Sequence, residues 1–488
     1  MKKYLVLTFL SLFSSVGWAS MYLYQPIGSS IVLGGYGNRH ALSTASGNPA
    51  SSYLMANLEG FRVGFLGPLG ISVEGGGVST INDDIDDLTD ILDSDFITDS
   101  DLQDIEDNAT AAYNTEYASS GDSSAAEAAA VASFVSDVDD LEVSINDTLS
   151  NADDVISSIT ETVYAKFATT LQAPFTPIIY KTRRRNVFTL EASASIVGRA
   201  SLLADSLTLT GLDGAGELYD DNLTYSEIYN LSLDDVDLET DTAAYIKRAS
   251  DYRFSIGYST MHSRTPTEAI LIGGRLNFHR LALGQKLTVL TEEDDPSVSY
   301  GDFFISRDKI STGISLDLGA LLVRRNFQLG MTLSNVNEPT FKYEEIGNCS
   351  GLTGADLTNC NAAVSFASSG DIDLNETYKM EAQMTIDAAI KSKDQHISLG
   401  GSYDVNPIKD PLGDEYQWSV VSLSFFSDYL LIPGIRAGIR QNLVGNELTY
   451  YTAGMTLSRR LDIDLAYAPE NDSGNSGLFF SMGYSFVF

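Results

Sequence analysis

Four charged residues near the C-terminus have types and spacing that could bind a polar solute or pair with one another. Arg436 and Arg440 lie four positions apart in one segment, and Asp462 and Asp464 lie two positions apart in another. Successive side chains of a strand point to opposite faces, so each pair would share a face if its segment is a strand. We therefore expect the four charges to face a common interior, either as a structural ion-pair network or as a polar path for a solute.

The two cysteines are the next residues with specific chemistry. Cys349 and Cys360 lie among Asn348, Gly351 and Gly354, which is the composition of a loop. In an oxidising compartment we expect them to form a disulfide. Closing so short a loop would stabilise the fold by roughly 3 kcal/mol on the chain-entropy estimate. A metal site would need further ligands, and no histidine lies nearby.

No set of residues in the sequence predicts catalysis. The histidines are scattered along the chain, at His40, His262, His279 and His396. Neither the His-Glu-x-x-His motif of zinc hydrolases nor the Gly-x-Ser-x-Gly motif of serine hydrolases occurs. A protease or phospholipase barrel would need a convergent Ser/His or Asp/His set. We therefore expect a protein that is not an enzyme and that uses no cofactor.

A long acidic stretch lies between Arg62 and Lys166, where the chain has no lysine or arginine. Apolar residues recur there with helical spacing in two series: Ile85, Leu88, Leu92 and Phe96, and later Leu141, Ile145, Leu149, Ala152, Ile156, Ile159 and Val163. Both series are one-sided stripes, which predict amphipathic helices. Residues 118–130, rich in Ser, Gly and Ala, lie between them. We expect residues 79–186 to be an acidic insertion that contains a helical hairpin.

The carboxylates of this insertion allow three roles: a solvated face, a divalent-cation site or a protein-binding tip. Asp93-Ser94-Asp95 and Asp99-Ser100-Asp101 place oxygen atoms close together. However, no twelve-residue calcium loop with a central Gly and a closing Glu is present, so we predict no metal. The basic run 181–185 is expected at the outer rim, where it could contact lipopolysaccharide phosphates or simply anchor the rim. The net charge of −36 argues against nucleic acid as a partner.

The two ends of the chain indicate export to an outer membrane. Lys2 and Lys3 precede a short apolar run, and Gly17 and Ala19 supply the small residues of a cleavage site, so residues 1–19 are predicted to be a signal peptide. The last strand alternates, with one face formed by Leu478, Phe480, Met482, Tyr484, Phe486 and Phe488. Such an aromatic ending resembles the signal read by the barrel-assembly machinery, and Tyr484, Phe486 and Phe488 would carry it.

Alternating segments upstream predict further strands. Counted back from the last strand, they are 461–468, 449–457, 433–441, 416–426, 395–404, 378–390, 326–336, 311–322, 269–290, 245–260, 200–210, 187–197 and 59–78. Short turns fall on one side of this series, and the long connections 79–186, 211–244, 291–310, 337–377 and 405–415 fall on the other. Short periplasmic turns and long outer loops are typical of outer-membrane barrels.

The sequence therefore predicts an all-β transmembrane barrel of about 14 antiparallel strands, within a range of roughly 12 to 16. No stretch after the signal peptide is apolar enough for a membrane-spanning helix. We expect a hatch segment at 20–58 and the barrel at 59–488, with the insertion at 79–186.

The segment before the first strand has a composition of its own. A Gly-rich run at 34–37 leads into a small-residue stretch and the turn Asn48-Pro49-Ala50. This order resembles the start of the long-chain fatty acid transporter (FadL) family. The resemblance implies that the segment forms a hatch inside the barrel, and that hydrophobic ligands bind beside it and leave sideways through a kinked strand.

The wider pattern is similar to the plasmid-transfer TraF-like outer-membrane family. The likeness is carried by the Asn-Pro-Ala turn, by the acidic insertion after the first strand, by Asn335-Val336-Asn337-Glu338-Pro339 and by residues 461–467. It spans nearly the whole mature chain. The insertion departs from the FadL pattern, which puts ligand entry from outside in doubt.

Two functions follow as hypotheses. The first is uptake of a small hydrophobic solute, which the resemblance to FadL implies. The second is a structural or docking role in an envelope or conjugal-transfer assembly, exercised through the acidic insertion. The expected partners are outer-membrane lipid, lipopolysaccharide and the barrel-assembly machinery, with a small hydrophobic ligand in the first case. An apolar lumen that opens sideways would favour uptake, and a plugged lumen would favour docking.

Overall fold

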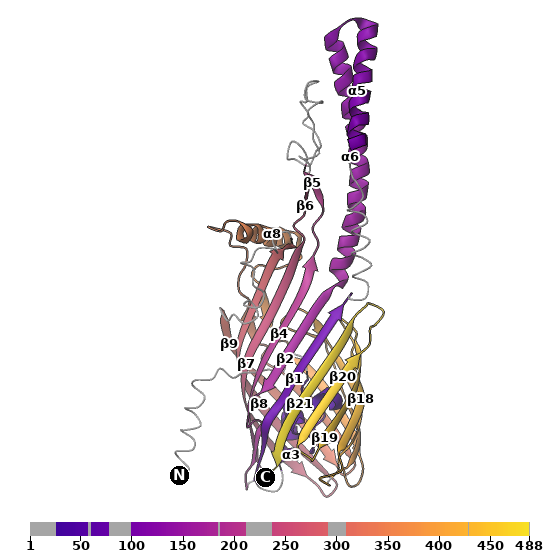
Figure 1. Ribbon diagram of the computed structural model, residues 1–488. Helices are drawn as coiled ribbons and strands as arrows, with labels where there is room; N and C mark the ends of the chain where they lie inside the picture. The colour runs from indigo at the N-terminus through magenta and orange to yellow at the C-terminus, as the bar shows by residue number, and fades with distance from the viewer. Residues whose placement is uncertain are drawn as a thin grey trace.

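A computed structural model describes residues 26–56, 60–77, 99–183, 186–210, 237–290, 309–427 and 429–487. Its main feature is a closed antiparallel barrel (Figure 1). The first strand, β1 (Gly60–Gly76), pairs with the last, β21 (Ser476–Val487), and this pairing closes the ring. The predicted signal peptide, 1–19, lies outside the described residues, as does Phe488 at the other end.

The barrel wall has 14 strand positions, as the sequence predicted. The sheet has 15 strands, but β2 (Tyr164–Gln172) and β3 (Ile178–Lys181) occupy one position, because both pair with β1 on one side and with β4 (Val187–Leu203) on the other. The remaining strands are β7 (Ala243–Arg264), β8 (Glu268–Val289), β9 (Ile310–Arg324), β10 (Phe327–Ser334), β13 (Gln383–Lys391), β14 (Ile397–Asp404), β17 (Trp418–Phe425), β18 (Gly434–Asn442), β19 (Thr449–Leu457) and β20 (Leu461–Ala468).

Two assignments behind the predicted count were wrong, and their errors cancel. Segments 187–197 and 200–210 are not two strands, because β4 runs through Gly198 and Arg199 in an unbroken ladder with β7. The missing strand is β2 with β3, which lies inside the range 79–186 assigned to the insertion. We had taken Gly198-Arg199 for a turn between two strands. The strand alternation that begins at Tyr164 was overlooked because it directly follows the helical stripe that ends at Val163.

The two faces of the wall differ as a membrane barrel requires. On β18, Ile435 and Ile439 are exposed, whereas Arg436 and Arg440 are buried. The same alternation of exposed apolar and buried polar side chains recurs on the other strands, which gives an apolar outer band and a polar interior. This is the construction of an outer-membrane barrel. Among the described helices, none is long and apolar enough to cross a membrane.

The acidic insertion is a hairpin of α5 (Asp99–Ser120) and α6 (Ser123–Thr162), which projects from one end of the barrel (Figure 1). Gly121 makes the turn with a positive φ, and the Asp122 carboxylate caps α6 by accepting a hydrogen bond from the Ser124 N–H (2.9 Å). The helices pack through Ile105, Ala109, Ala130, Phe134 and Val138. Helix occupies nearly all of 118–130, the Ser-, Gly- and Ala-rich residues between the two predicted stripes.

Of the two apolar stripes predicted in the insertion, most of the second lies within the described residues. In the second stripe, Leu149, Ala152, Ile156 and Ile159 are buried within α6. The first stripe, 85–96, lies outside the described residues, and so does the Asp93-Ser94-Asp95 candidate. The range 79–186 is not one insertion, because β2 and β3 of the wall occupy its last part.

The connections are sorted by length between the two ends of the barrel. The short turns 265–267, 325–326, 392–396 and 458–460 lie at the end opposite to the hairpin (Figure 1). The turn that follows β3 lies with them, so Lys181 and Arg183 are not at the hairpin rim, where we expected the basic run. We had not recognised β2 and β3 as a strand of the wall. Because the chain crosses the wall once more there, the basic run lies at the opposite end of the barrel from the end we expected.

The topology can be tested by cysteine labelling of intact cells. Because long loops face outward in such barrels, Ala118→Cys near the hairpin turn should react with a membrane-impermeant maleimide. Lys393→Cys, in the turn 392–396, should react only after the outer membrane is permeabilised. The reverse labelling pattern would show that the barrel is inverted.

Candidate functional site

The N-terminal segment lies inside the barrel, in contact with its wall. Residues 26–56 form α2 (Ser30–Leu33), the short helices η1 (Leu42–Ser46) and η2 (Pro49–Ser51), and α3 (Ser52–Met55). Most of their side chains are buried. Helix α2 lies against β17 to β20, and η2 lies against β7 to β9. We refer to residues 26–56 as the hatch.

The Asn48-Pro49-Ala50 turn joins the hatch to the wall. The Asn48 side-chain oxygen accepts a hydrogen bond from Ala50 N–H (2.9 Å). Its amide nitrogen donates to the carbonyls of Ala320 on β9 (3.3 Å) and Met331 on β10 (3.2 Å). One asparagine thus fixes its own turn and binds two neighbouring strands.

Two glycines that face each other across β8 and β9 make room for this turn. Gly273 and Gly319 are paired in the ladder. A Cβ atom at Gly319 would lie 2.2 Å from Asn48 Oδ1, and one at Gly273 would lie 2.7 Å from the Ala50 nitrogen. The missing side chains therefore form a notch in the wall that the turn occupies.

Basic residues from the wall bind the end of the hatch through its backbone. Arg62 donates from Nη1 to the Arg39 carbonyl (2.7 Å) and from Nη2 to the His40 carbonyl (3.3 Å). Lys181 donates to the Ala56 carbonyl (3.2 Å) and lies over the Tyr53 ring. Lys181, which we had placed at the lipopolysaccharide rim, therefore anchors the hatch.

Three of the four predicted interior charges come together. Arg436 Nε lies 2.6 Å from Asp464 Oδ1, and its Nη2 lies 3.5 Å from Asp462 Oδ1. Arg436 Nη1 also donates to the Thr456 hydroxyl (2.7 Å). These side chains are buried and mutually paired, so they form a structural ion-pair network. Arg440 is not part of it.

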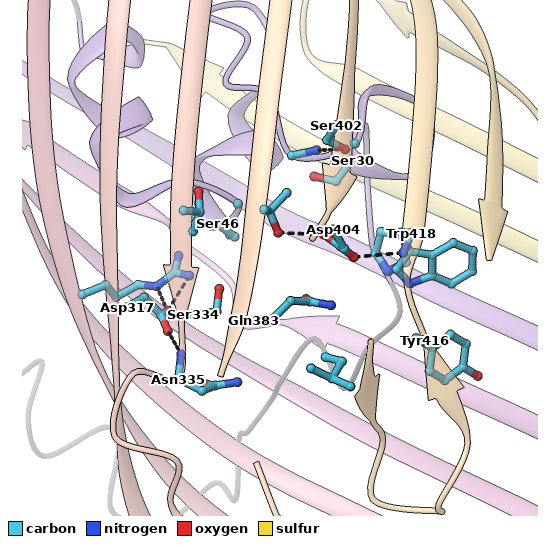
Figure 2. Close-up of a pocket in the computed structure, with 18 of the residues that line it drawn as sticks. Ser30, Ser46, Asp317, Ser334, Asn335, Gln383, Ser402, Asp404, Tyr416 and Trp418 are labelled. Atoms are coloured by element: carbon cyan, nitrogen blue, oxygen red, sulfur yellow. Dashed lines mark hydrogen bonds and ion pairs between the residues drawn. The ribbon is translucent and has the colours of Figure 1, made fainter. Parts of the chain in front are cut away.

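A cavity of ≈ 240 Å³ lies in the lumen beside the hatch (Figure 2). Polar residues are the majority of those that line it, and Arg253, Arg275 and Arg440 occur there together with Asp317 and Asp404. Arg275 is held by Asp317 (2.9 Å). Ser30, Gly34 and Gly35 contribute the hatch side of the wall. The lumen cavity therefore contains charged side chains, which binding of a purely hydrophobic solute would not require.

A Ser-His-Asp arrangement in this wall was missed by sequence reasoning. His279 Nδ1 lies 2.8 Å from Asp251 Oδ2, and its Nε2 lies 3.0 Å from the Ser315 hydroxyl. The three residues come from β7, β8 and β9, so only the strand register brings them together. Ser315 is fully buried and also accepts a hydrogen bond from Asn277 (3.0 Å). A nucleophile needs access to a substrate, so this arrangement serves as a structural hydrogen-bond network.

The loop 405–417 folds into the mouth of the barrel at the hairpin end. Asp410 and Asp414 both bind the Lys166 ammonium, which lies 2.7 Å from Asp414 and is buried on β2. Burial raises the pKa of Asp410; at Asp414 burial acts in the same direction but is outweighed by Lys166 and Arg199, which lower its pKa. This loop is fixed across the mouth by paired charges.

Tyr416, at the end of that loop, borders two cavities. It lines the lumen cavity and a second cavity of ≈ 270 Å³ closer to the hairpin, which Glu161 of α6 also lines. Its hydroxyl accepts a hydrogen bond from Lys166 (2.7 Å). The loop and this side chain therefore separate the lumen from the hairpin end. The sequence had assigned 405–415 only as a long connection.

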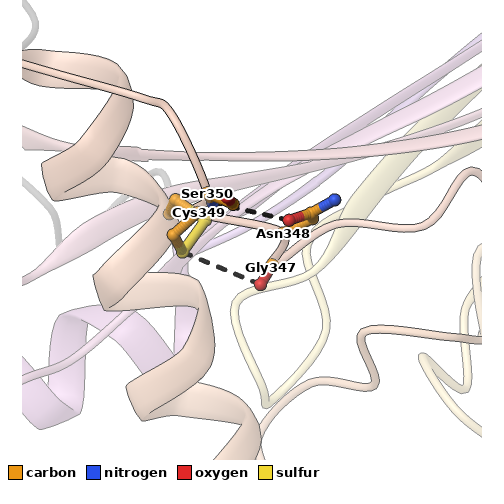
Figure 3. Close-up of a disulfide and its surroundings, with 5 residues drawn as sticks. Gly347, Asn348, Cys349 and Ser350 are labelled. Atoms are coloured by element: carbon orange, nitrogen blue, oxygen red, sulfur yellow. Dashed lines mark hydrogen bonds between the residues drawn. A yellow bond between two sulfur atoms is a disulfide. The ribbon is translucent and has the colours of Figure 1, made fainter.

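The predicted disulfide is present between Cys349 and Cys360, with a Cα–Cα distance of 5.6 Å (Figure 3). It ties the loop at 349 to α8 (Ala355–Ser369), a helix that we had not predicted. Phe366 and Ala362 of α8 pack against the end of the wall at Leu287. The disulfide therefore holds an outer loop on the rim of the barrel.

Two of the predicted assembly-signal residues, Tyr484 and Phe486, lie in the seam that closes the barrel. Phe486 pairs with Val63 and Tyr484 with Leu66 across the β1–β21 seam. Asp99 and Asp101 lie at the beginning of α5. Within the described ranges, no three His, Cys, Asp or Glu residues are grouped to hold a metal ion.

Comparison with known proteins gave one family and several structures. The sequence model described as "F plasmid transfer operon, TraF, protein" matches residues 45–404. No curated protein matches the chain. The toluene transporter TbuX of Ralstonia pickettii is 12% identical, with a TM-score of 0.41 over 95% of this chain and 100% of its own. The toluene transporter TodX of Pseudomonas putida is 11% identical, with a TM-score of 0.39 over 94% and 97%. Likeness at this level says nothing of substrate.

Filling the wall notch tests how the hatch is held. Gly319→Val would place side-chain atoms where Asn48 and Pro49 lie, and we expect it to lower the free energy of unfolding by about 1–3 kcal/mol. The measurement is the urea midpoint of the heat-modifiable band in electrophoresis. Gly274→Ala is the matched control, because its Cβ would have only ordinary contacts, the nearest at 3.6 Å. Equal midpoints for both variants would contradict the notch.

Proposed function

Because the chain belongs to the family described as the TraF protein of the F plasmid transfer operon, we propose that it is an outer-membrane docking component of an envelope assembly, of the conjugal-transfer kind or another. The docking element is the hairpin of α5 and α6, which lies within the matched range. The observation that carries the proposal is the contrast between a plugged lumen and a long projecting hairpin.

The hairpin is built as a stiff arm. At 1.5 Å per residue, the 40 residues of α6 extend for about 60 Å. An apolar seam between the helices includes Phe134 and Val138, and Asn108 also donates a hydrogen bond to Asp137 (3.1 Å). Only Val163 separates α6 from β2, so the arm continues directly into the barrel wall. A segment that served only to connect two strands would need none of this construction.

The surface of the hairpin is uniformly acidic. No lysine or arginine occurs between Arg62 and Lys166. The exposed carboxylates on the two helices are Asp104, Asp107, Glu127, Asp139, Asp140, Asp154 and Glu161. Such a surface attracts a basic partner and repels an acidic one, which gives orientation and specificity. We therefore expect the partner to present a basic face.

Uptake of a small hydrophobic solute is the second candidate, and one irregularity of the wall favours it. The β1–β21 pairing is shifted twice between Gly64 and Leu69, and β2 and β3 are interrupted beside it. A small cavity there, of ≈ 20 Å³, is lined by Leu42 of the hatch and by Leu66 and Pro68 of β1. The lipid face and the hatch come close at this point, but the cavity is too small for a solute.

Charge reversal on the hairpin tests the docking function. We expect Glu127→Lys combined with Asp140→Lys to reduce partner cross-linking in intact cells by roughly tenfold, because about 1.4 kcal/mol is lost with the attraction. Cross-links would be formed from a photoreactive residue at Ser124. The matched control is Glu127→Gln with Asp140→Asn, which should give an intermediate loss. Barrel abundance should not change in either variant. An unchanged cross-link after charge reversal would refute a basic partner.

A direct transport measurement tests the second candidate. If the protein is a docking component, cells with and without it should take up labelled toluene and other small hydrophobic compounds at equal rates, because the hatch lies in the lumen and the cavity at the seam is too small for a solute. A protein-dependent increase in uptake would instead support transport. The rates should be compared in cells whose outer membranes are equally intact, as judged by exclusion of a large hydrophobic antibiotic.

A further inference from the structure

Arg436 and Arg440 lie on the same face of β18 but have opposite environments. Arg436 binds Asp464, Asp462 and Thr456. Arg440 is just as buried, with 4% of its surface exposed, yet no described carboxylate lies within ion-pair distance of it. One strand thus carries an arginine in direct ion pairs and, four residues further, an arginine with no ion-pair contact among the described residues, for which Asp404 is a more distant negative charge.

The contacts of Arg440 leave most of its donors unused. Its Nη2 donates to the Ser30 carbonyl of the hatch (3.0 Å), which is its one hydrogen bond among the described residues. Its guanidinium lies 4.9 Å from the centre of the Trp418 ring. Asp404, the carboxylate on the same side of the cavity, accepts hydrogen bonds from the Thr385 hydroxyl (2.7 Å) and from the backbone N–H of Trp418 (3.0 Å). Figure 2 shows the bond between Trp418 and Asp404.

Burying an arginine without a counter-charge is costly, and an oxyanion would remove that cost. A guanidinium in a low-dielectric site needs a negative partner or a full set of hydrogen bonds. Arg440 lines the lumen cavity, so the space for such a partner lies beside it. Its planar donors match the two oxygens of a carboxylate or phosphate group.

We propose that the lumen cavity is a binding site for a small soluble solute that carries a carboxylate or phosphate group, with Arg440 as its primary ligand. Arg253 and Arg275 line the same cavity from β7 and β8, but Glu191 and Asp317 pair with them, so Arg440 is the arginine of this wall that an anion would pair with. Lipid and lipopolysaccharide phosphates lie outside the barrel, so the ligand is a free anion. The bond from Arg440 to Ser30 places the anion directly against α2 of the hatch.

This site is independent of the docking function. It rests on the lumen, whereas docking rests on the hairpin, and neither requires the other. It also differs from hydrophobic uptake in ligand chemistry, because an apolar solute would leave Arg440 without a counter-charge.

Tryptophan fluorescence offers a direct measurement. The sequence has two tryptophans, Trp18 and Trp418, and Trp18 lies in the predicted signal peptide. In the chain cleaved after Ala19, all tryptophan emission comes from the ring beneath Arg440. The purified barrel in detergent would be titrated with succinate and with inorganic phosphate, and with erythritol as an uncharged control of similar size.

We expect a saturable change with succinate, with phosphate or with both, and none with erythritol. Arg440→Met should weaken the binding roughly tenfold to a hundredfold, because a charge-assisted pair is lost, and Arg440→Lys should retain part of it. Arg324→Gln, at an exposed turn, should bind as the wild type does. Folding of every variant would be checked by its heat-modifiable band.

Four results would overturn the proposal. The first is a wild-type barrel whose emission does not change with either anion, which needs no variant to fold. The second is an equal response to erythritol, because the cavity would then bind by hydrogen bonding without using the charge. The third is unchanged anion affinity in a folded Arg440→Met or Arg440→Lys barrel. A response to added lipopolysaccharide alone would also count against a free anion.

Discussion

The closure of one hydrogen-bonded ladder is the constraint on which the rest of this structure depends. Inside a bilayer no water is available for backbone N–H and C=O groups, so each strand needs a partner on both sides. The pairing of β1 with β21 supplies the last set of partners. It tolerates two register shifts, and the interruption between β2 and β3 lies directly beside them. The hatch precedes β1 and the hairpin follows it, so both are attached next to this seam.

Once the wall is closed, its alternation sends every second side chain into a lumen too narrow to be wet throughout. Polar groups there must satisfy one another, and most do. Arg436 with Asp464, and His279 with Asp251 and Ser315, are examples. The hatch satisfies others through its backbone, as it does for Arg62. Arg440 has a single hydrogen bond and no ion pair among the described residues, and for that reason we connect it with function and not with packing.

Much of the fold could be predicted from the sequence, because alternation and loop length are local signals. The interior position of Arg436 and Asp464 followed from the alternation, and the disulfide followed from two cysteines in an exported chain. The number of strands was also correct, although two errors in the assignments cancelled. The partners of each interior side chain could not, because they depend on register between strands that are far apart in the sequence. The network of Asp251, His279 and Ser315 is of this kind. The strand β2–β3 was missed because it begins one residue after a helix, without a turn signal between them.

The direct passage from α6 into β2 gives the hairpin the mechanics of a lever. The hairpin would rotate about Val163, at the end of α6. The strand just beyond it is fixed by the ion pairs of Lys166 with Asp410 and Asp414. An arm of about 60 Å amplifies small rotations, so a tilt of about 5° at Val163 displaces the far end by about 5 Å. The tilt of β2 in the wall therefore determines how far above the membrane the tip of the hairpin lies. A force applied at the tip would act first on the ion pairs of Lys166 with Asp410 and Asp414.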